Sequence, residues 1–265
     1  LFLITLFTCI TGGGADDLDN SIAHMSKKIE VDPGDPELYY SRANVYMMKK
    51  DYDKAITDLD KAIKINPVNY YLYFWRGNCY EKKRDFNKAL ADYNKAIELN
   101  PDYPYAYQVR GNLHSRQKEH DKAVSDYNNA IDLDAEDPDS YLYRGLVYSD
   151  KKEYDKAIAD FNKALEISPD DFLTYYSRGL CYFNMRQIDK ASADCAKLEE
   201  LTPEDQFSYL CRGQFYLRLQ RFDKAMRDFK AALALDENDN YVYVCFSLYS
   251  WHVNKNKAES LNYLE

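Results

Sequence analysis

The chain has 265 residues and a net charge of −9, and 46% of its residues are hydrophobic. This apolar content excludes wholesale disorder, because such a chain can bury enough surface to offset the entropy lost on folding. The acidic balance, with Lys residues interleaved among Asp and Glu, argues against a nucleic-acid partner, since phosphate neutralisation needs clustered Lys and Arg. The 9 Gly and 8 Pro residues suit long helices joined by short turns.

The first fifteen residues predict a truncated secretory signal peptide. Leu1–Ile10 is nearly all apolar, and Gly12–Ala15 supplies small residues before a cleavage point ahead of Asp16. The run is too short to span a bilayer. Two alternatives remain, a lipidated Cys9 and a plain N-terminal tail. We therefore expect an exported protein (periplasmic, secreted or surface-anchored), with a cytoplasmic location as the alternative. Contact with a membrane is expected only if Cys9 carries a lipid anchor.

A lone helix is expected within residues 16–35. The segment from Leu18 to Asp32 reads as a helix, and Pro33 follows it and stops it. We interpret 16–35 as an N-terminal half-repeat, because Pro33 stands 34 residues before Pro67.

The region from residue 36 to residue 239 repeats itself every 34 residues. Taking one small residue of the motif as position 8 divides it into six repeats, 36–69, 70–103, 104–137, 138–171, 172–205 and 206–239. Position 8 is Ala43, Gly77, Gly111, Gly145, Gly179 and Gly213. Position 4 is Tyr39, Tyr73, Tyr107, Tyr141, Tyr175 and Tyr209. Position 20 is Ala55, Ala89, Ala123, Ala157, Ala191 and Ala225, and position 24 is Leu59, Tyr93, Tyr127, Phe161, Cys195 and Phe229.

These columns indicate two helices per repeat. Positions 4, 8 and 11 share one helical face, as do 20, 24 and 27. Small residues at 8, 20 and 27 let the two helices approach closely, and the aromatic residues fill the space between them. An acidic or amide residue at position 18, such as Asp53 or Asn87, can cap the second helix or complement its dipole.

The 34-residue pattern resembles the tetratricopeptide repeat (TPR). The resemblance implies an all-α fold, an α-solenoid in which antiparallel helix pairs follow a right-handed superhelix. His114 and His120 depart from the pattern by replacing aromatics in the third repeat, and Cys195 and Leu198 loosen it in the fifth. Residues 240–265 are expected to form a partial seventh repeat or truncated capping helices.

In this family ligands usually lie on the concave face lined by the first helices, where the resemblance places positions 2, 5, 9 and 12. Amides at position 9 suit an extended peptide's main chain, and aromatics beside them resemble a binding hot spot. The alternative is that the aromatics only pack between helices. The candidate binding residues are Tyr40, Asn44, Tyr71, Phe74, Trp75, Asn78, Tyr105, Gln108 and Asn112.

One known binding mode of the family is not expected here. Some members hold a chaperone's C-terminal carboxylate with Lys, Asn and Arg at fixed groove positions. Asn44 matches one of these, but Tyr40, Trp75, Tyr105 and Val109 stand where the other polar and basic residues would be.

These features favour a non-catalytic scaffold that binds a protein or extended peptide. The alternative is an accessory repeat region of a longer protein with a catalytic or membrane domain. No GxSxG or Gly-rich motif indicates an enzyme, and no CxxC spacing or His cluster indicates a metal site, so neither metal nor cofactor is expected.

Two charged columns are invariant through the six repeats. Position 7 is Arg42, Arg76, Arg110, Arg144, Arg178 and Arg212, and position 23 is Asp58, Asp92, Asp126, Asp160, Asp194 and Asp228. Both lie next to buried positions, so we predict that each Arg binds the Asp of its own repeat at the edge of the helix–helix seam. The alternative is a ladder of Arg residues that reads an acidic ligand.

Overall fold

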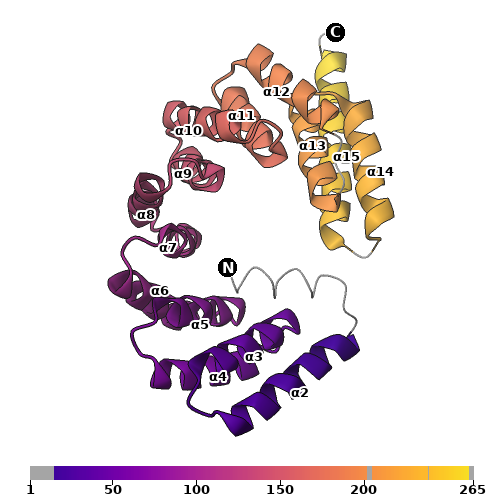
Figure 1. Cartoon of the computed structure of the whole chain (residues 1–265). Coiled ribbons are helices and arrows are strands. Elements are labelled where there is room, and N and C mark those ends of the chain that lie inside the picture. Colours follow the sequence, from indigo (N-terminus) through magenta and orange to yellow (C-terminus); the bar gives the residue numbers. More distant parts are fainter. Residues whose placement is uncertain (1–14, 202–204, 238, 263–265) are drawn as a thin grey trace. The chain divides into compact units, whose positions relative to one another are not determined.

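The computed structural model describes residues 15–201, 205–237 and 239–262, the side chains of 15, 16 and 256–262 excepted. Within these ranges the chain forms helices α2 to α15 and no strand, which confirms the all-α prediction (Figure 1). The right-handed superhelix stays a prediction. The predicted signal peptide and Cys9 lie outside the described residues, apart from Ala15, where α2 begins.

The helices form two compact units, which divide after Ala135. The N-terminal unit contains α2 (Ala15–Val31), α3 (Pro36–Met48), α4 (Tyr52–Ile65), α5 (Tyr70–Lys82), α6 (Phe86–Leu99), α7 (Pro104–Arg116) and α8 (His120–Leu133). Repeats one, two and three are the pairs α3–α4, α5–α6 and α7–α8, and α2 packs on α3. The predicted helix of the half-repeat thus lies beside the first full repeat.

The C-terminal unit contains α9 (Pro138–Asp150), α10 (Tyr154–Ile167), α11 (Phe172–Asn184), α12 (Ile188–Glu200), α13 (Gln206–Arg218), α14 (Phe222–Leu235) and α15 (Asn240–Asn262). The first six form repeats four to six. After these six, the described residues 239–262 form one helix, α15. It buries Val242 and Cys245 and exposes Tyr243, Val244 and Trp251.

Each first helix ends in the same turn. In repeat one the Lys50 N–H donates to the carbonyl of Met47 and the Asp51 N–H to that of Tyr46, each at 2.9 Å. This pair of bonds is the Schellman motif, which requires a left-handed residue. That residue is at position 15 and is never Gly: Lys50, Arg84, Lys118, Lys152, Arg186 and Gln220 have φ between 58° and 62°.

The caps of the second helices differ from the prediction. The capping residue is at position 16, where Asp51 accepts from the Lys54 N–H and Asp85 from the Lys88 N–H. Asp53 instead lies inside the first turn of α4, where its charge complements the positive end of the helix dipole. Capping by position 18 was therefore wrong, and the dipole alternative fits the structure.

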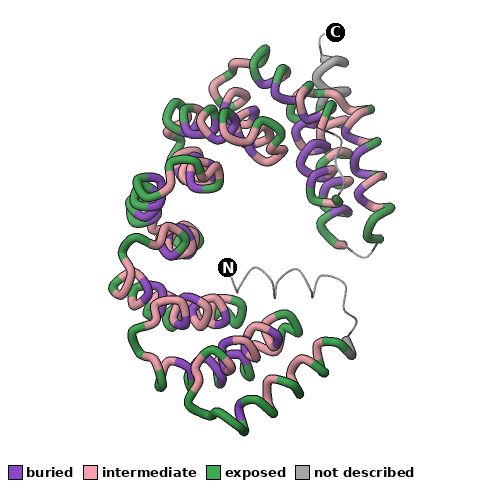
Figure 2. The backbone as a smooth tube through the Cα atoms, in the orientation of Figure 1, coloured by how far each residue is buried: buried purple, intermediate pink, exposed green. Residues whose placement is uncertain are grey.

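The core consists of the seams between paired helices, where Figure 2 shows the buried residues. A Cβ added to Gly145 would lie 2.7 Å from the Phe161 ring, so glycine at position 8 makes room for an aromatic residue at position 24. Repeat five lacks that aromatic because it has Cys195. There Phe215 of α13 takes its place, 2.6 Å from a Cβ built on Gly179.

Candidate functional site

The first helices α3, α5 and α7 carry all nine predicted binding residues. Asp35 and Asn69 cap α3 and α5 through side-chain hydrogen bonds, and each helix starts at the same point of its repeat. Residues at positions 2, 5 and 9 therefore share one face of each helix. We call the surface formed by these positions, together with position 6, the first-helix face of the N-terminal unit.

Aromatic rings join the three helices on this face. The ring centroid of Tyr71 on α5 lies 5.6 Å from that of Tyr40 on α3 and 5.8 Å from that of Trp75. Phe74 lies 5.2 Å from Tyr103, the residue before α7, at an interplanar angle of 79°. Edge-to-face contacts of this kind are favourable beyond the area that they bury. The aromatics thus form one continuous cluster.

The predicted residues differ in accessibility. Tyr105 is 54% exposed, whereas Tyr40 and Phe74 are 6% exposed and Gln108 is 9% exposed. Tyr40, Phe74 and Gln108 were predicted to contact a partner, but the structure buries them. These three residues fit the alternative that they pack between helices, because they lie buried under the exposed residues of the face. Tyr71 is only partly buried.

The buried hydroxyls of the cluster stay protonated. Burial and the neighbouring Tyr71 raise the pKa of Tyr40 well above its usual value. Burial and the nearby hydroxyls of Tyr71 and Tyr70 raise the pKa of Tyr103 in the same direction. The hydroxyls of Tyr40 and Tyr103 therefore act as neutral donors and acceptors.

The three position-9 amides are not equivalent. Asn44 and Asn78 are partly exposed and make no hydrogen bond to any described residue. The Asn112 side-chain oxygen instead accepts a hydrogen bond of 2.7 Å from the hydroxyl of Tyr127, a residue that is 1% exposed. Asn112 was predicted to face a ligand, but it has a structural role as the partner of a buried hydroxyl.

A second buried tyrosine reaches this face in repeat two. The Tyr93 hydroxyl donates to Glu81 at 2.9 Å, and Arg116 donates to the other oxygen of the same carboxylate at 2.7 Å. The charge of Glu81 is thus balanced by Arg116. The first-helix face around Asn78 therefore presents amides and aromatic rings and little net charge.

Sequence reasoning missed Tyr70 and Tyr103. Tyr103 occupies the N-cap position of α7 and makes no side-chain capping bond, whereas the equivalent residues of the other repeats, such as Asn69 and Asp137, do. Replacing a cap by a residue that cannot cap costs roughly 1 kcal/mol. The N-cap position is Asp or Asn in the other repeats, so the Tyr at this position in the sequence could have indicated that it belongs to the aromatic cluster.

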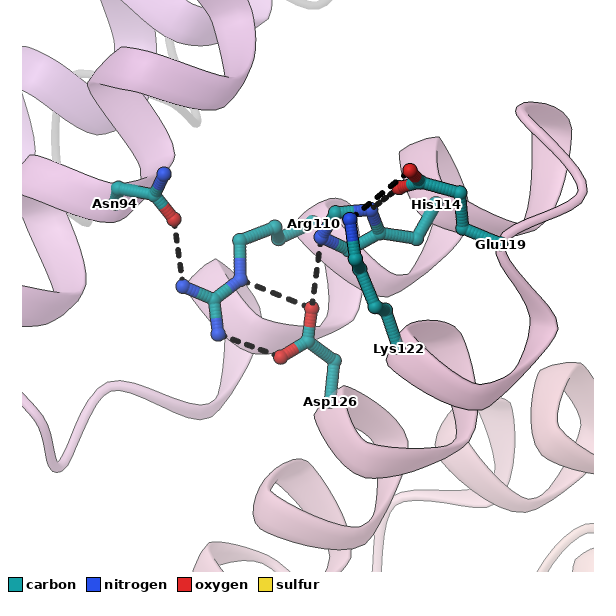
Figure 3. Close-up of polar contacts among 6 residues, drawn as sticks. All are labelled: Asn94, Arg110, His114, Glu119, Lys122 and Asp126. Carbon is teal, nitrogen blue, oxygen red and sulfur yellow. Dashed lines mark hydrogen bonds and ion pairs between the residues drawn. The ribbon is translucent and has the colours of Figure 1, made fainter.

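The predicted pairing of the charged columns is confirmed in all six repeats. Each Arg donates through Nε and Nη2 to the two oxygens of the Asp sixteen residues later, at 2.6–3.0 Å. Figure 3 shows Arg110 and Asp126. The Asp side chains are at most 9% exposed. The alternative of an Arg ladder that reads an acidic ligand is therefore wrong.

The remaining Arg nitrogen, Nη1, reaches the preceding repeat, which sequence reasoning missed. It donates at 2.7 Å to position 25 there: Arg76 to Asp60, Arg110 to Asn94 and Arg178 to Asn162. For Arg212 the equivalent position is Ala196, whose side chain has no acceptor atom. Arg212 Nη1 instead donates to the Leu198 carbonyl at 3.0 Å. One guanidinium therefore joins three helices.

His114 of repeat three has a structural role in the fold. His114 Nδ1 lies 2.6 Å from Glu119, and its Nε2 lies 3.9 Å from Asp126 (Figure 3). In the other repeats a Tyr stands at this position and a Lys lies over its ring, at 5.2–5.6 Å from the centroid. In repeat three the equivalent Lys122 keeps only its ion pair with Glu119, at 2.9 Å, which matches the pairs Lys54–Asp51 and Lys88–Asp85 of the first two repeats. The departure from the pattern is thus a substitute polar network.

The described residues contain no group of three His, Cys, Asp or Glu side chains placed to bind a metal. Within the same ranges no helix has the length and apolar content needed to cross a bilayer. The five described cysteines are buried free thiols.

Comparison with known families identifies the fold. Tetratricopeptide-repeat profiles match residues 36–69, 70–103, 138–171 and 206–239, windows that coincide with four of the six repeats. Further profiles of the same repeat match 92–125, 111–152 and 161–191. The chain therefore belongs to the tetratricopeptide-repeat family. A search of curated proteins finds no match.

Solved structures agree with this assignment. A tetratricopeptide repeat protein from Parabacteroides merdae is 21% identical with a TM-score of 0.72, over 89% of this chain and 93% of that one. MamA is 28% identical with a TM-score of 0.58, over 63% and 91%. YrrB, described as a TPR protein with an unusual peptide-binding site, is 20% identical with a TM-score of 0.58, over 69% and 95%.

Proposed function

We propose that this chain is a non-catalytic protein-interaction scaffold and that a peptide or protein segment binds to the first-helix face of repeats one to three. Membership of the TPR family supports an interaction scaffold in general. The peptide-binding site named for YrrB supports a peptide as the ligand. The choice of face rests on the residues of α5 and their neighbours.

The observation that carries the proposal is a pair of unused polar groups on α5. Asn78 makes no hydrogen bond to a described residue, and the buried Nε1–H of Trp75 has no acceptor among those residues. The two residues are three apart, so they lie on the same side of the helix. A buried donor without a partner destabilises a protein by about 1–3 kcal/mol. Main-chain groups of an extended peptide are suitable partners for both side chains.

The surrounding rings supply the apolar part of such a site. Tyr105 is exposed, and Tyr71 and Trp75 are partly exposed over the buried Phe74. Tyr and Trp combine a large contact area with a polar tip and are enriched at interfaces where most binding energy concentrates. A partner that places an apolar side chain against Tyr105 and its main chain against Asn78 would use both features.

The test begins with capture of proteins from the native source by the full chain, and then measures the Kd of the captured partner. We expect Asn78→Ala to weaken binding about tenfold, equivalent to ~1.4 kcal/mol. The matched control is Asn87→Ala on α6, an exposed residue of a second helix. Equal binding by both variants would contradict the proposed face.

Asn112→Ala separates binding from stability. Because it leaves the Tyr127 hydroxyl without its acceptor, we expect it to lower the free energy of unfolding by about 1–3 kcal/mol. Asn78→Ala should change the free energy of unfolding by less than ~0.5 kcal/mol. If both variants lower stability equally, Asn78 has a structural partner and the assignment fails.

The broader setting is also a proposal. The apolar residues 1–10 support export to the periplasm, the medium or the cell surface. Fractionation of cells producing the complete reading frame would test it, and recovery in the cytoplasm would overturn it. The same reading frame would test the alternative that these repeats serve a longer protein.

A further inference from the structure

The turns between paired helices carry a row of basic residues that the proposed function does not use. In the N-terminal unit, position 15 is Lys50 after α3, Arg84 after α5 and Lys118 after α7. We propose that these three residues form a docking ridge for an acidic polypeptide segment, separate from the first-helix face. Three observations support the ridge: backbone conformation, exposure and the arrangement of neighbouring charges.

The backbone favours glycine where these side chains stand. Lys50, Arg84 and Lys118 have φ of 59°, 62° and 61°. In this left-handed region a Cβ is unfavourable, and helix ends of this type most often have Gly. Position 15 nevertheless has a side chain in all six repeats, basic in five of them. A side chain at a position whose backbone conformation favours glycine indicates that the side chain has a role outside the turn itself.

The row is exposed and lacks the ion pairs that its neighbours make. Lys50, Arg84 and Lys118 are all exposed, and none has an acidic partner among the described residues. Their neighbours differ: Lys49 pairs with Asp19, and Lys83 pairs with Asp53. The three residues thus place unpaired cations at equivalent turns of successive repeats, in a chain of net charge −9.

A purely structural role accounts poorly for the row. Basic residues near a helix C-terminus stabilise it through the dipole. Lys49 and Lys83 already stand at the C-caps of α3 and α5, so the dipole has its cation without position 15. The Schellman bonds use main-chain atoms only and would form equally well with glycine.

The surrounding charges favour an acidic polypeptide over a polyphosphate. Asp51, Asp85 and Glu119 follow the row directly, and each is held by a Lys three residues later at 2.8–2.9 Å. A membrane or nucleic acid brings dense, continuous negative charge and would meet these carboxylates as well as the cations. An extended segment with spaced Asp or Glu residues can contact the cations and leave the carboxylates alone. Repeat two, with Lys82 and Arg84 both exposed, is the most basic part of the ridge.

The test uses the conformational preference itself. In the full chain, Lys50→Gly, Arg84→Gly and Lys118→Gly are combined, which removes the cations and gives each turn its preferred residue. Binding of a fluorescein-labelled oligoglutamate peptide is followed by anisotropy at low salt, with oligoglutamine as the neutral probe. We expect the triple variant to bind oligoglutamate at least tenfold more weakly and to melt at the same temperature as the unmodified chain or higher. The charge control, Lys49→Gln with Lys83→Gln, should bind within about twofold of the unmodified chain.

Several outcomes would overturn the ridge. The first is that the triple glycine variant binds oligoglutamate as tightly as the unmodified chain does. The second is that the unmodified chain shows no preference for oligoglutamate over oligoglutamine. The third is that it binds anionic vesicles or duplex DNA more tightly than oligoglutamate. A lower melting temperature in the glycine variant would overturn the backbone argument; Lys50→Gln, Arg84→Gln and Lys118→Gln, which keep a side chain, would then test the charge alone. Asn78→Ala should bind oligoglutamate normally, so failure of the first-helix face and failure of the ridge are distinguishable.

Discussion

Gly145 and Phe161 offer a quantitative test of how the seam is packed. In a helix interior, Gly→Ala alone stabilises by roughly 0.5–1 kcal/mol. At Gly145, however, the new Cβ would lie 2.7, 2.9 and 3.2 Å from three atoms of the fully buried Phe161 ring. Overpacking of this kind costs about 1–3 kcal/mol. We therefore expect Gly145→Ala to lower the free energy of unfolding by about 1–2 kcal/mol, and Gly145→Val to lower it further.

Repeat one shows which second change should rescue the first. It has Ala43 at position 8 and the smaller Leu59 at position 24, both fully buried. Phe161→Leu alone should cost about 1 kcal/mol through the space it opens. Combined with Gly145→Ala it removes the overlap, so the double variant should be more stable than the sum of the single effects by ~1 kcal/mol or more.

The assay is urea unfolding of the full chain, monitored by far-UV circular dichroism. The unfolding midpoints of the variants are compared, because stability in repeat proteins is distributed over units and interfaces. Ala43→Gly controls for helix propensity, since it enlarges a site that has no overlap to relieve. Two results would refute the reasoning: single effects that add within ~0.5 kcal/mol, and a Gly145→Ala variant more stable than the unmodified chain.

Two further predictions concern the charged seam and the thiols. Arg110→Met and Asp126→Asn should each lower the free energy of unfolding by about 3–5 kcal/mol, because each leaves a largely buried charge or polar group unpaired. The double variant should lose less than the sum of the two, and strictly additive losses in urea unfolding would contradict the pairing. The exposed Lys54–Asp51 pair, whose two single effects should add, is the control. Burial raises the pKa of Cys79 to about 12 and that of Cys195 to about 11, so both thiols stay protonated at pH 8. They should therefore react with a disulfide reagent only after unfolding, and rapid modification of the native chain at pH 8 would contradict this.

The sequence predicts those features that recur in every repeat. The Gly and aromatic columns located the helix pairs, and the matched Arg and Asp columns identified the six ion pairs, because a contact made within each repeat leaves the same mark every 34 residues. The sequence did not predict the hydrogen bond from Arg110 to Asn94, because position 25 varies among Asp, Asn, Ala and Lys and only the stacking of repeats brings it to the guanidinium.

The candidate face was less predictable because its features occur once. Asn44, Asn78 and Asn112 look identical in sequence, yet Asn112 is bound by Tyr127, whereas position 24 of the first repeat is Leu59, which has no hydroxyl. Tyr40 and Phe74 were predicted to be accessible from their column, but the rings of Tyr71 and Tyr103 pack against them. Such differences depend on neighbours in space rather than on the repeat.

The third contact of each guanidinium has a consequence for how such a chain can change length. In the pairs Arg76–Asp60, Arg110–Asn94 and Arg178–Asn162 the acceptor stands sixteen residues before the Arg. Loss or duplication of a whole 34-residue segment among such repeats therefore re-forms the contact with the equivalent residue of another repeat. Deleting 70–103 would bring Asp60, which now binds Arg76, to Arg110 in place of Asn94. An in-frame gene rearrangement at these boundaries thus preserves the junction, and the variation at position 25 records which acceptors the junction tolerates.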